Sequence, residues 1–221
     1  MKGSRSAGQP RVLPDDEAGR AVAIDVLRAG GIVALPTDTV YGIAVALTTP
    51  GGIERLFHVK HRAPEKGIAL LLADAAQART IALLNADADL LAAAFWPGPL
   101  TLVLPRDPTV PLPEALTGGS PTVGLRFPDH PCVRAIAGAI GPLPTTSANR
   151  SGEPDALDAG TVVTQLGADV DLVLDGGPVR GSVPSTVVDC TVTPPAILRE
   201  GALEGARILE ALSIGPHAGR S

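Results

Sequence analysis

Apolar runs of strand length alternate with capped helical segments along most of this 221-residue chain. Asp15 or Asp16 can cap a first helix that ends at Gly30-Gly31, and the apolar run 32–35 follows directly as a buried strand. The alternation continues toward the end of the chain without a repeat of fixed period. This order predicts an α/β fold with a mixed sheet rather than a helical bundle or a sandwich.

Further strands are expected at residues 40–47, 68–72, 100–104, 122–126, 172–174, 185–189 and 196–199. Helices are expected at residues 50–59, 129–140 and 203–212, with another that begins at Asp158 and two short ones capped by Asp74 and Asp87. The polar cluster 145–149 is expected to follow a strand.

We predict a single domain. A hydrophobic content of 45% is enough for a sizeable core. The Pro- and Gly-rich stretches at 96–121 and 175–184 are interpreted as loops, because strand-like runs resume on both sides of each. The domain is expected to cover residues 16–212, between a mobile N-terminal tail at 1–15 and a C-terminal tail at 213–221.

Composition argues against several classes of partner. A net charge of -5 and an aromatic content of 2% do not suit a broad nucleic-acid interface. There is no run of eighteen apolar residues and no signal-peptide core, so we expect a cytoplasmic protein without membrane contact. Cys132 and Cys190 lie in apolar runs without a CxxC partner, and are expected to be buried and reduced.

Lysine is rare in this chain, and its distribution points to a cationic loop. Three lysines stand against fifteen arginines, yet Lys60 and Lys66 lie within seven residues of each other with Arg62 between them. The hydroxyl-rich segment 36–42 precedes this loop by one helix length. Such a loop suits a phosphate-bearing small molecule, although a solvated helix end whose cations complement the helix dipole is the alternative interpretation.

Common nucleotide and catalytic motifs are missing from the sequence. It contains neither a GxxxxGK[ST] loop nor a GxGxxG turn, and it has no GxSxG elbow. His58 and His61 lie three residues apart without an evident third metal ligand. The hydroxyls of the cluster 145–149 remain open to two interpretations, a ligand-binding set or a turn followed by a helix cap.

Seven motifs in order carry a family resemblance. They are PTDTVYG at 36–42, KHR at 60–62, FWPGPLT at 95–101, TVGLR at 122–126 with PDHP at 128–131, TTSAN at 145–149 with SG at 151–152, PSTVVD at 184–189 and LR at 198–199. Together they resemble the YrdC-like family of threonylcarbamoyl-AMP synthases over about residues 16–212. The resemblance implies a single α/β domain in which a twisted mixed sheet with flanking helices surrounds a cationic concave cavity.

The implied activity is adenylyl transfer. L-threonine, bicarbonate and ATP give threonylcarbamoyl-AMP and pyrophosphate, in the first step toward N6-threonylcarbamoyladenosine in tRNA. Magnesium is expected with ATP, although the sequence names no ligands for it. A separate transferase complex would use the product, and no stable tRNA binding is expected of this chain.

The resemblance also implies residue roles. Lys60 and Arg62 are the expected catalytic cations. ATP would be bound by Lys60, Arg62, Lys66, Thr122, Ser147, Asn149 and Arg199. Threonine would be bound by Thr39, Arg126, Thr145 and Ser185, with a bidentate grip of Arg126 on the carboxylate.

Three positions depart from the family pattern. Some relatives have Asn in place of Lys66 and His in place of Leu71, so no histidine contact to threonine is expected here. Asp155 stands where longer relatives have a serine that contacts ATP.

Two other functions remain as alternatives: a double-stranded RNA or tRNA binding module of the same fold, and a carbamoyl-transfer domain. Carbamoyl-transfer proteins carry a Cys-rich zinc segment that this chain lacks.

Overall fold

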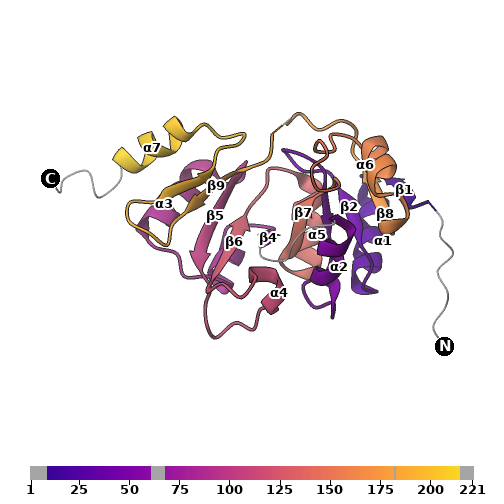
Figure 1. Cartoon of the computed structure of the whole chain (residues 1–221), viewed down its shortest axis with the longest axis horizontal. Helices are drawn as coiled ribbons and strands as arrows, with labels where there is room; N and C mark the ends of the chain where they lie inside the picture. Colours follow the sequence, from indigo (N-terminus) through magenta and orange to yellow (C-terminus); the bar gives the residue numbers. More distant parts are fainter. Residues whose placement is uncertain (1–8, 61–67, 182, 215–221) are drawn as a thin grey trace.

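The computed structural model describes residues 9–60, 68–181 and 183–214. In this part of the chain ten strands form one twisted sheet in the order β1-β8-β2-β3-β7-β4-β6-β5-β9-β10. The sheet runs along the length of the molecule, with β1 at one end and α7 near the other (Figure 1). The predicted α/β fold with a mixed sheet is confirmed.

The strands are short. They are β1 (Arg11–Pro14), β2 (Val33–Leu35), β3 (Gly42–Ala44), β4 (Ala69–Leu71), β5 (Leu100–Pro105), β6 (Thr122–Arg126), β7 (Leu143–Ser147), β8 (Leu172–Asp175), β9 (Thr186–Asp189) and β10 (Ala196–Arg199). Parallel pairs are β1 with β8, β2 with β8, β4 with β6 and β5 with β9, and the other pairs are antiparallel.

The helices of the described residues are α1 (Glu17–Arg28), α2 (Gly52–Lys60), α3 (Ala86–Phe95), α4 (Glu114–Thr117), α5 (Pro131–Ile140), α6 (Ala159–Leu166) and α7 (Gly205–Ile214), with short 3-10 helices at Ala76–Thr80 and Gly167–Asp169. Asp16 and Asp158 cap α1 and α6, as predicted. The cap of α3 is Asn85 rather than Asp87, which lies inside the first turn, where its negative charge complements the helix dipole. Within the part of the chain that the structure describes, none of the helices could span a membrane.

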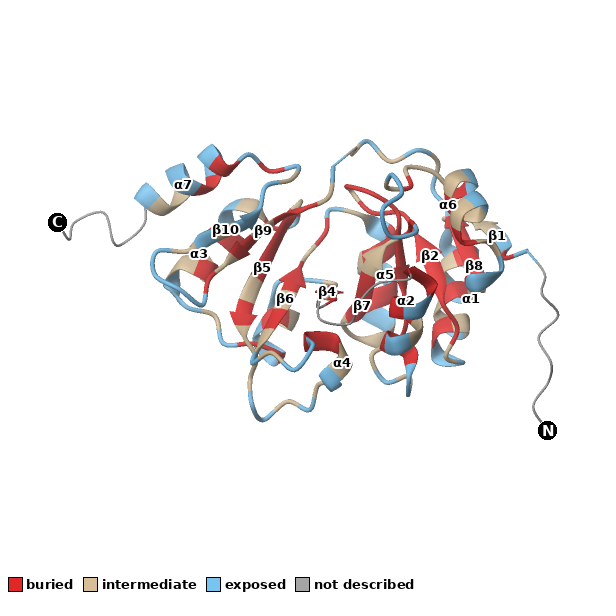
Figure 2. Ribbon diagram, viewed as in Figure 1, coloured by how far each residue is buried: buried red, intermediate tan, exposed pale blue. Residues whose placement is uncertain are grey.

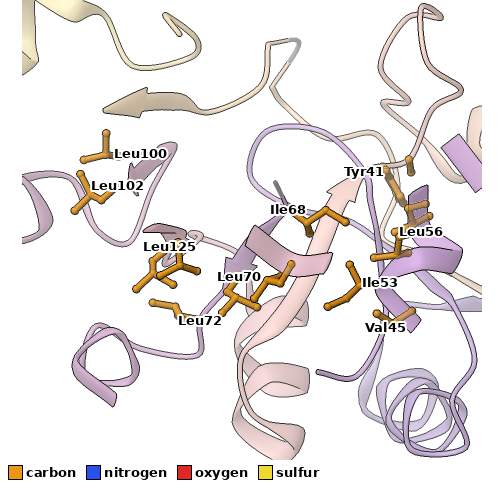
Figure 3. Packing of buried hydrophobic residues seen from close by; sticks show 14 of the residues in the cluster. Tyr41, Val45, Ile53, Leu56, Ile68, Leu70, Leu72, Leu100, Leu102 and Leu125 are labelled. Carbon is orange, nitrogen blue, oxygen red and sulfur yellow. The ribbon is translucent and has the colours of Figure 1, made fainter. Parts of the chain in front are cut away.

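The sheet buries a different cluster on each face. On one face, Ala34, Ile43, Leu70 and Leu125 belong to a cluster shared with α2, α3, α6 and α7. Figure 3 shows part of this cluster, in which Leu70 and Leu125 come from neighbouring strands. On the other face, Val33, Leu35, Ala44, Leu71, Leu143, Leu172 and Leu174 pack against α1 and α5. The inner strands such as β2 and β8 are accordingly mostly buried in Figure 2, whereas the edge strand β10 is largely exposed.

The structure also differs from the sequence prediction at residues 11–14 and 145–147. Residues 11–14 were expected in a mobile tail, but they form β1 and extend the sheet beside β8. β1 lies at the edge of the sheet and is mostly exposed, and its four residues RVLP form no long apolar run that would have predicted a strand. The hydroxyls of 145–147 were expected after a strand, but they lie inside β7. Cys132 and Cys190 are buried and not disulfide bonded, as predicted.

Candidate active site

A cavity of about 430 Å³ lies over the face of the sheet that α1 and α5 cover only in part. Much of its lining comes from alternate residues of neighbouring strands. They include Ala69 and Leu71 of β4, Thr101 and Val103 of β5, Thr122, Gly124 and Arg126 of β6, and Thr145 and Ser147 of β7. Because side chains alternate between the two faces of a strand, these residues share one face, and the leucines between them fill the apolar core on the other.

The residue types on this face explain why it stays open. Under α1 and α5 the face is apolar, whereas over β4, β5, β6 and β7 it carries mainly Ala, Gly, Thr and Ser. A Cβ added to Gly124 would lie 3.6 Å from Cγ2 of Thr101, which is ordinary contact. The backbone therefore does not require glycine at this position, and its effect is to leave space in the cavity. Small side chains here leave room for a ligand.

Arg126 is the charged residue in the floor of the cavity. It ends β6 and is 6% exposed. Nε donates to the carbonyl of Gly98 at 3.1 Å, Nη1 to Oγ1 of Thr39 at 2.9 Å and Nη2 to Oδ1 of Asp38 at 2.5 Å. Burial lowers the pKa of Arg126, and the charge of Asp38 opposes this shift. The guanidinium is therefore buried, paired and fixed in direction.

A chain of hydroxyls supports Arg126 from the segment between β2 and β3. Oγ1 of Thr37 donates to the carbonyl of Val40 at 2.7 Å. The contact of 3.1 Å between the hydroxyls of Thr37 and Thr39 must then use the proton of Thr39. Thr39 accepts from Arg126 and donates to Thr37, so its hydroxyl is left with acceptor capacity only toward a ligand.

A second group lies where β5, β9 and β10 meet. Oγ1 of Thr101 and Oγ of Ser185 are 2.8 Å apart. Nη2 of Arg199 donates to the carbonyl of Ser185 at 2.8 Å. Partial burial lowers the pKa of Arg199, and the charge of Asp155 opposes the shift. The charge of Arg199 also lowers the pKa of Arg126, so the two cations act on the same cavity.

Lys60 lies behind the cavity wall rather than in it. Its residue is 3% exposed, and Nζ donates to Oγ of Ser147 at 2.9 Å, to the carbonyl of Ser147 at 2.6 Å and to Oδ1 of Asn149 at 2.7 Å. Oγ of Ser147 also donates to Oδ1 of Asn149, at 2.6 Å. In this arrangement Lys60, at the end of α2, is hydrogen bonded to Ser147 at the end of β7 and to Asn149 just after it. Of these three residues, Ser147 is the one that lines the cavity.

Most of the predicted site residues come together. Thr39, Thr122, Arg126, Thr145, Ser147, Ser185 and Arg199 line the cavity, and Lys60 and Asn149 lie directly behind Ser147. Arg62 and Lys66 lie outside the described residues. Leu71, which replaces a histidine of some relatives, also lines the cavity. The predicted site residues thus share one cavity, and the ligand that each of them binds stays a prediction.

Sequence reasoning gave no role to Thr37, Asp38 and Thr101. All three belong to motifs that carried the resemblance, PTDTVYG and FWPGPLT. The signal that could have found Thr101 is period two, since Thr101 and Val103 share a face of β5 with the cavity. Asp38 could not be paired with Arg126 from sequence, because 88 residues separate them.

The described residues contain one group with metal-ligand types away from the cavity. Ligand atoms of Asp15, His130 and Cys132 lie within 4.8 Å of one another. Both carboxylate oxygens of Asp15 accept from Arg20, at 2.6 and 3.0 Å, and burial raises the pKa of the Cys132 thiol. A neutral thiol and an arginine on the carboxylate suit a hydrogen-bonded cluster better than a cation site.

Fold and cavity together define an α/β protein with a buried arginine and a rim arginine around a small hydroxyl-lined pocket, which suits small anionic ligands. The family model Sua5/YciO/YrdC, described as "Telomere recombination", matches residues 25–201. The chain belongs to this family.

Two curated relatives and one solved structure illustrate the similarity. The threonylcarbamoyl-AMP synthase of Pyrococcus abyssi is 37% identical over 184 residues, covering 82% of this chain and 54% of that protein. The putative threonylcarbamoyl-AMP synthase of Mycobacterium leprae is 37% identical over 205 residues, covering 92% of each. The structure of P. abyssi Sua5 complexed with L-threonine has a TM-score of 0.85 at 33% identity, over 92% of this chain and 60% of that one. The chain thus spans about half of one relative and nearly all of another.

Proposed function

We propose that the protein is a threonylcarbamoyl-AMP synthase. The α-amine of L-threonine and bicarbonate condense to a carbamate with loss of water. An oxygen of the carbamate then bonds to the α-phosphorus of ATP as the bond to pyrophosphate breaks. The convergence of Thr39, Arg126 and Ser185, from segments far apart in the sequence, on one cavity carries this proposal. Relatives that bear this activity in their names support it.

In this proposal the floor of the cavity binds threonine. Arg126 presents a fixed guanidinium that suits a carboxylate, a geometry that lysine does not reproduce. Thr39, Thr145 and Ser185 would surround the rest of the amino acid. Oγ1 of Thr145 already donates to the carbonyl of Leu143 at 2.9 Å, so it too would act as an acceptor.

The nucleotide would lie toward Ser147, Thr122 and Arg199 on the cavity wall. Arg199 would face the phosphates, where a rim cation stabilises charge that moves onto the leaving pyrophosphate. Lys60 would hold Ser147 and Asn149 in place, and would reach a phosphate only by exchanging one of its present hydrogen bonds. Arg62 and Lys66 keep the phosphate roles that the resemblance implies.

Positioning supplies much of the proposed rate. A carbamate is short-lived in water, so holding it beside the α-phosphorus in a sheltered cavity favours transfer over loss of CO2. Well-oriented reactants gain roughly 7 to 11 kcal/mol relative to free ones. No covalent intermediate with the protein is needed.

Magnesium is proposed as a companion of ATP. The described residues that line the cavity include no Asp or Glu, so the phosphate oxygens and water would supply most of its ligands. We further propose that the protein acts in the cytoplasm, in the first step toward N6-threonylcarbamoyladenosine in tRNA. A separate transferase complex would then consume the product.

Pyrophosphate release tests the proposal directly. The pure protein is incubated with ATP, Mg2+, bicarbonate and L-threonine, and pyrophosphate is measured with each component omitted in turn. Release should require both threonine and bicarbonate. An Arg126→Lys variant should lose most of this activity, whereas Arg134→Lys, which alters a surface pair with Asp129, should not. Formation of ADP and phosphate instead would contradict adenylyl transfer.

A further inference from the structure

Arg126 receives its direction from three acceptors on two segments of the chain. The carbonyl of Gly98 lies before β5, Thr39 lies between β2 and β3, and Asp38 is its neighbour. Asp38 makes the shortest of the three contacts, and the paired side chains of Arg126 and Asp38 are 7% and 14% exposed. A charge-assisted hydrogen bond in so sheltered a place is stronger than one between neutral groups.

The hydrogen-bond count leaves a matched pair of donors. A guanidinium has five N–H groups. Among the described residues, the three acceptors take Nε–H and one N–H on each of Nη1 and Nη2. One N–H on each terminal nitrogen remains, and two such donors form a bidentate pair with a carboxylate when they point to the same edge of the guanidinium.

Asp38 contacts Arg126 without itself lining the cavity. Its neighbours Thr37 and Thr39 both line the cavity, but Asp38 is not among the lining residues. The carboxylate of Asp38 is therefore placed to act through Arg126 and not on the substrate itself. Without an acceptor at this position, Nη2 would lose its hydrogen bond and the guanidinium would be free to turn toward another acceptor.

We infer that Asp38 is a positioning residue for the amino-acid subsite: it fixes the plane of Arg126 so that two N–H groups face the carboxylate of the substrate. This inference rests on the proposed function, since it needs an amino acid in the cavity. The role is geometric, so an uncharged acceptor of the same shape should preserve it. Asp38→Asn keeps an oxygen toward Nη2, whereas Asp38→Ala removes it.

Isothermal calorimetry of the full chain with L-threonine and with ATP, together with steady-state pyrophosphate release, tests the inference. Asp38→Ala should raise the Kd and KM for threonine about tenfold or more, the loss expected for one orienting charge-assisted hydrogen bond. Its Kd for ATP should stay within about twofold of the wild type, which also shows that the variant is folded. Asp38→Asn should stay within about threefold for both ligands.

Two controls accompany these variants. Asp129→Ala removes the acid of an exposed Asp–Arg pair with Arg134 and should leave both affinities unchanged. If Asp38→Ala does not fold, Asp38→Ser is used, because its hydroxyl is too short to replace the carboxylate but admits water to the guanidinium. The same rise in the threonine Kd is expected for Asp38→Ser.

The outcomes separate this role from the proposed function. Wild-type protein that neither binds threonine nor releases pyrophosphate with it would overturn both. Wild-type binding with an unchanged threonine Kd in Asp38→Ala, or in Asp38→Ser where that variant replaces it, would overturn the role of Asp38 alone. A loss in Asp38→Asn as large as that in Asp38→Ala would overturn the geometric role, because it would show that the charge itself is required.

Discussion

At the scale of single residues, the side chains of the candidate site are held in place by hydrogen bonds to one another. The hydroxyl of Thr39 connects two of these residues, since it accepts a hydrogen bond from Arg126 and donates one to Thr37. A substitution that removes only this hydroxyl separates its role from that of the surrounding volume.

Thr39→Val keeps nearly the same shape and removes the acceptor for Nη1. Hydrogen bonds to charged groups contribute about 1.5 to 3 kcal/mol, so we expect the Kd for threonine to rise about tenfold or more while the Kd for ATP is unchanged. Calorimetry with each ligand measures both. Thr109→Val, which removes an exposed hydroxyl bonded to Asp107, is the matched control. Weaker ATP binding with intact threonine binding would mean that the two halves of the cavity are assigned the wrong way round.

Tyr41 is the chain's one tyrosine and lies in the same segment between β2 and β3 as Thr39, so the ionisation of its hydroxyl reports on the burial of this segment. Its hydroxyl donates to the carbonyl of Gly177 at 2.8 Å, and burial raises its pKa to about 12. At pH 11 about a tenth of the folded protein should therefore carry tyrosinate, against about nine tenths for a tyrosine with the ordinary pKa of 10.0. Absorbance at 295 nm measures this directly.

The same shift has a consequence for stability. Because the unfolded chain ionises near pH 10 and the folded one near 12, the stabilisation is complete below pH 10 and is lost as pH rises to about 12. The free energy of unfolding should fall by up to about 2.7 kcal/mol across this window, as measured with urea. Ionisation of Tyr41 near pH 10 in the folded protein would contradict its burial.

At the scale of elements, the cavity results from the alternation of side chains along the strands, which places small and polar residues on one face of the sheet. Gly124 lies on the cavity side of β6 between Thr122 and Arg126. A Cβ at this position would meet Thr101 and Ala69 at 3.6 to 3.8 Å, so a larger side chain would extend into the cavity without disturbing the sheet. Valine is also a favourable residue in a strand.

Gly124→Val should therefore fold with an unchanged or higher Tm but lose more than about tenfold in threonine-dependent pyrophosphate release. Gly138→Ala is the control, because its Cβ would lie 3.8 Å from Ala73 on an exposed part of α5 and should raise helix stability without touching the cavity. Full activity in Gly124→Val would show that the substrates bind elsewhere.

The sequence predicted this strand and its bounds, but not which face would be open. Residues 122–126 alternate clearly, so period two alone places Thr122, Gly124 and Arg126 on one side of a strand. The side that faces the cavity depends on the sheet order, in which β9 pairs with β5 although more than 80 residues separate them. Long-range pairing of this kind leaves no local pattern. The family motifs predicted Arg126 and Thr39 as site residues. The contact between Asp38 and Arg126 could not be predicted, because it joins residues 88 apart in the sequence.

At the scale of the whole molecule, charge and burial bear on whether this protein holds tRNA. The net charge is -5, and the cations Lys60 and Arg126 are 3% and 6% exposed, committed to partners inside the protein. Binding to a nucleic-acid backbone needs several exposed cations, and single-stranded bases need exposed aromatic rings. Exposed arginines such as Arg28, Arg79 and Arg150 are each paired with an aspartate. An aromatic content of 2% leaves few rings for base stacking.

We therefore expect the protein to make and release threonylcarbamoyl-AMP without tRNA. Adding tRNA at physiological salt should leave the initial rate of pyrophosphate release nearly unchanged, and lowering the salt should not create a large tRNA effect, because binding through phosphates would strengthen steeply as salt falls. Filter binding across a range of salt concentrations measures the same property without the reaction. A strong acceleration by tRNA alone, or a steep salt dependence of tight binding, would instead favour the RNA-binding alternative.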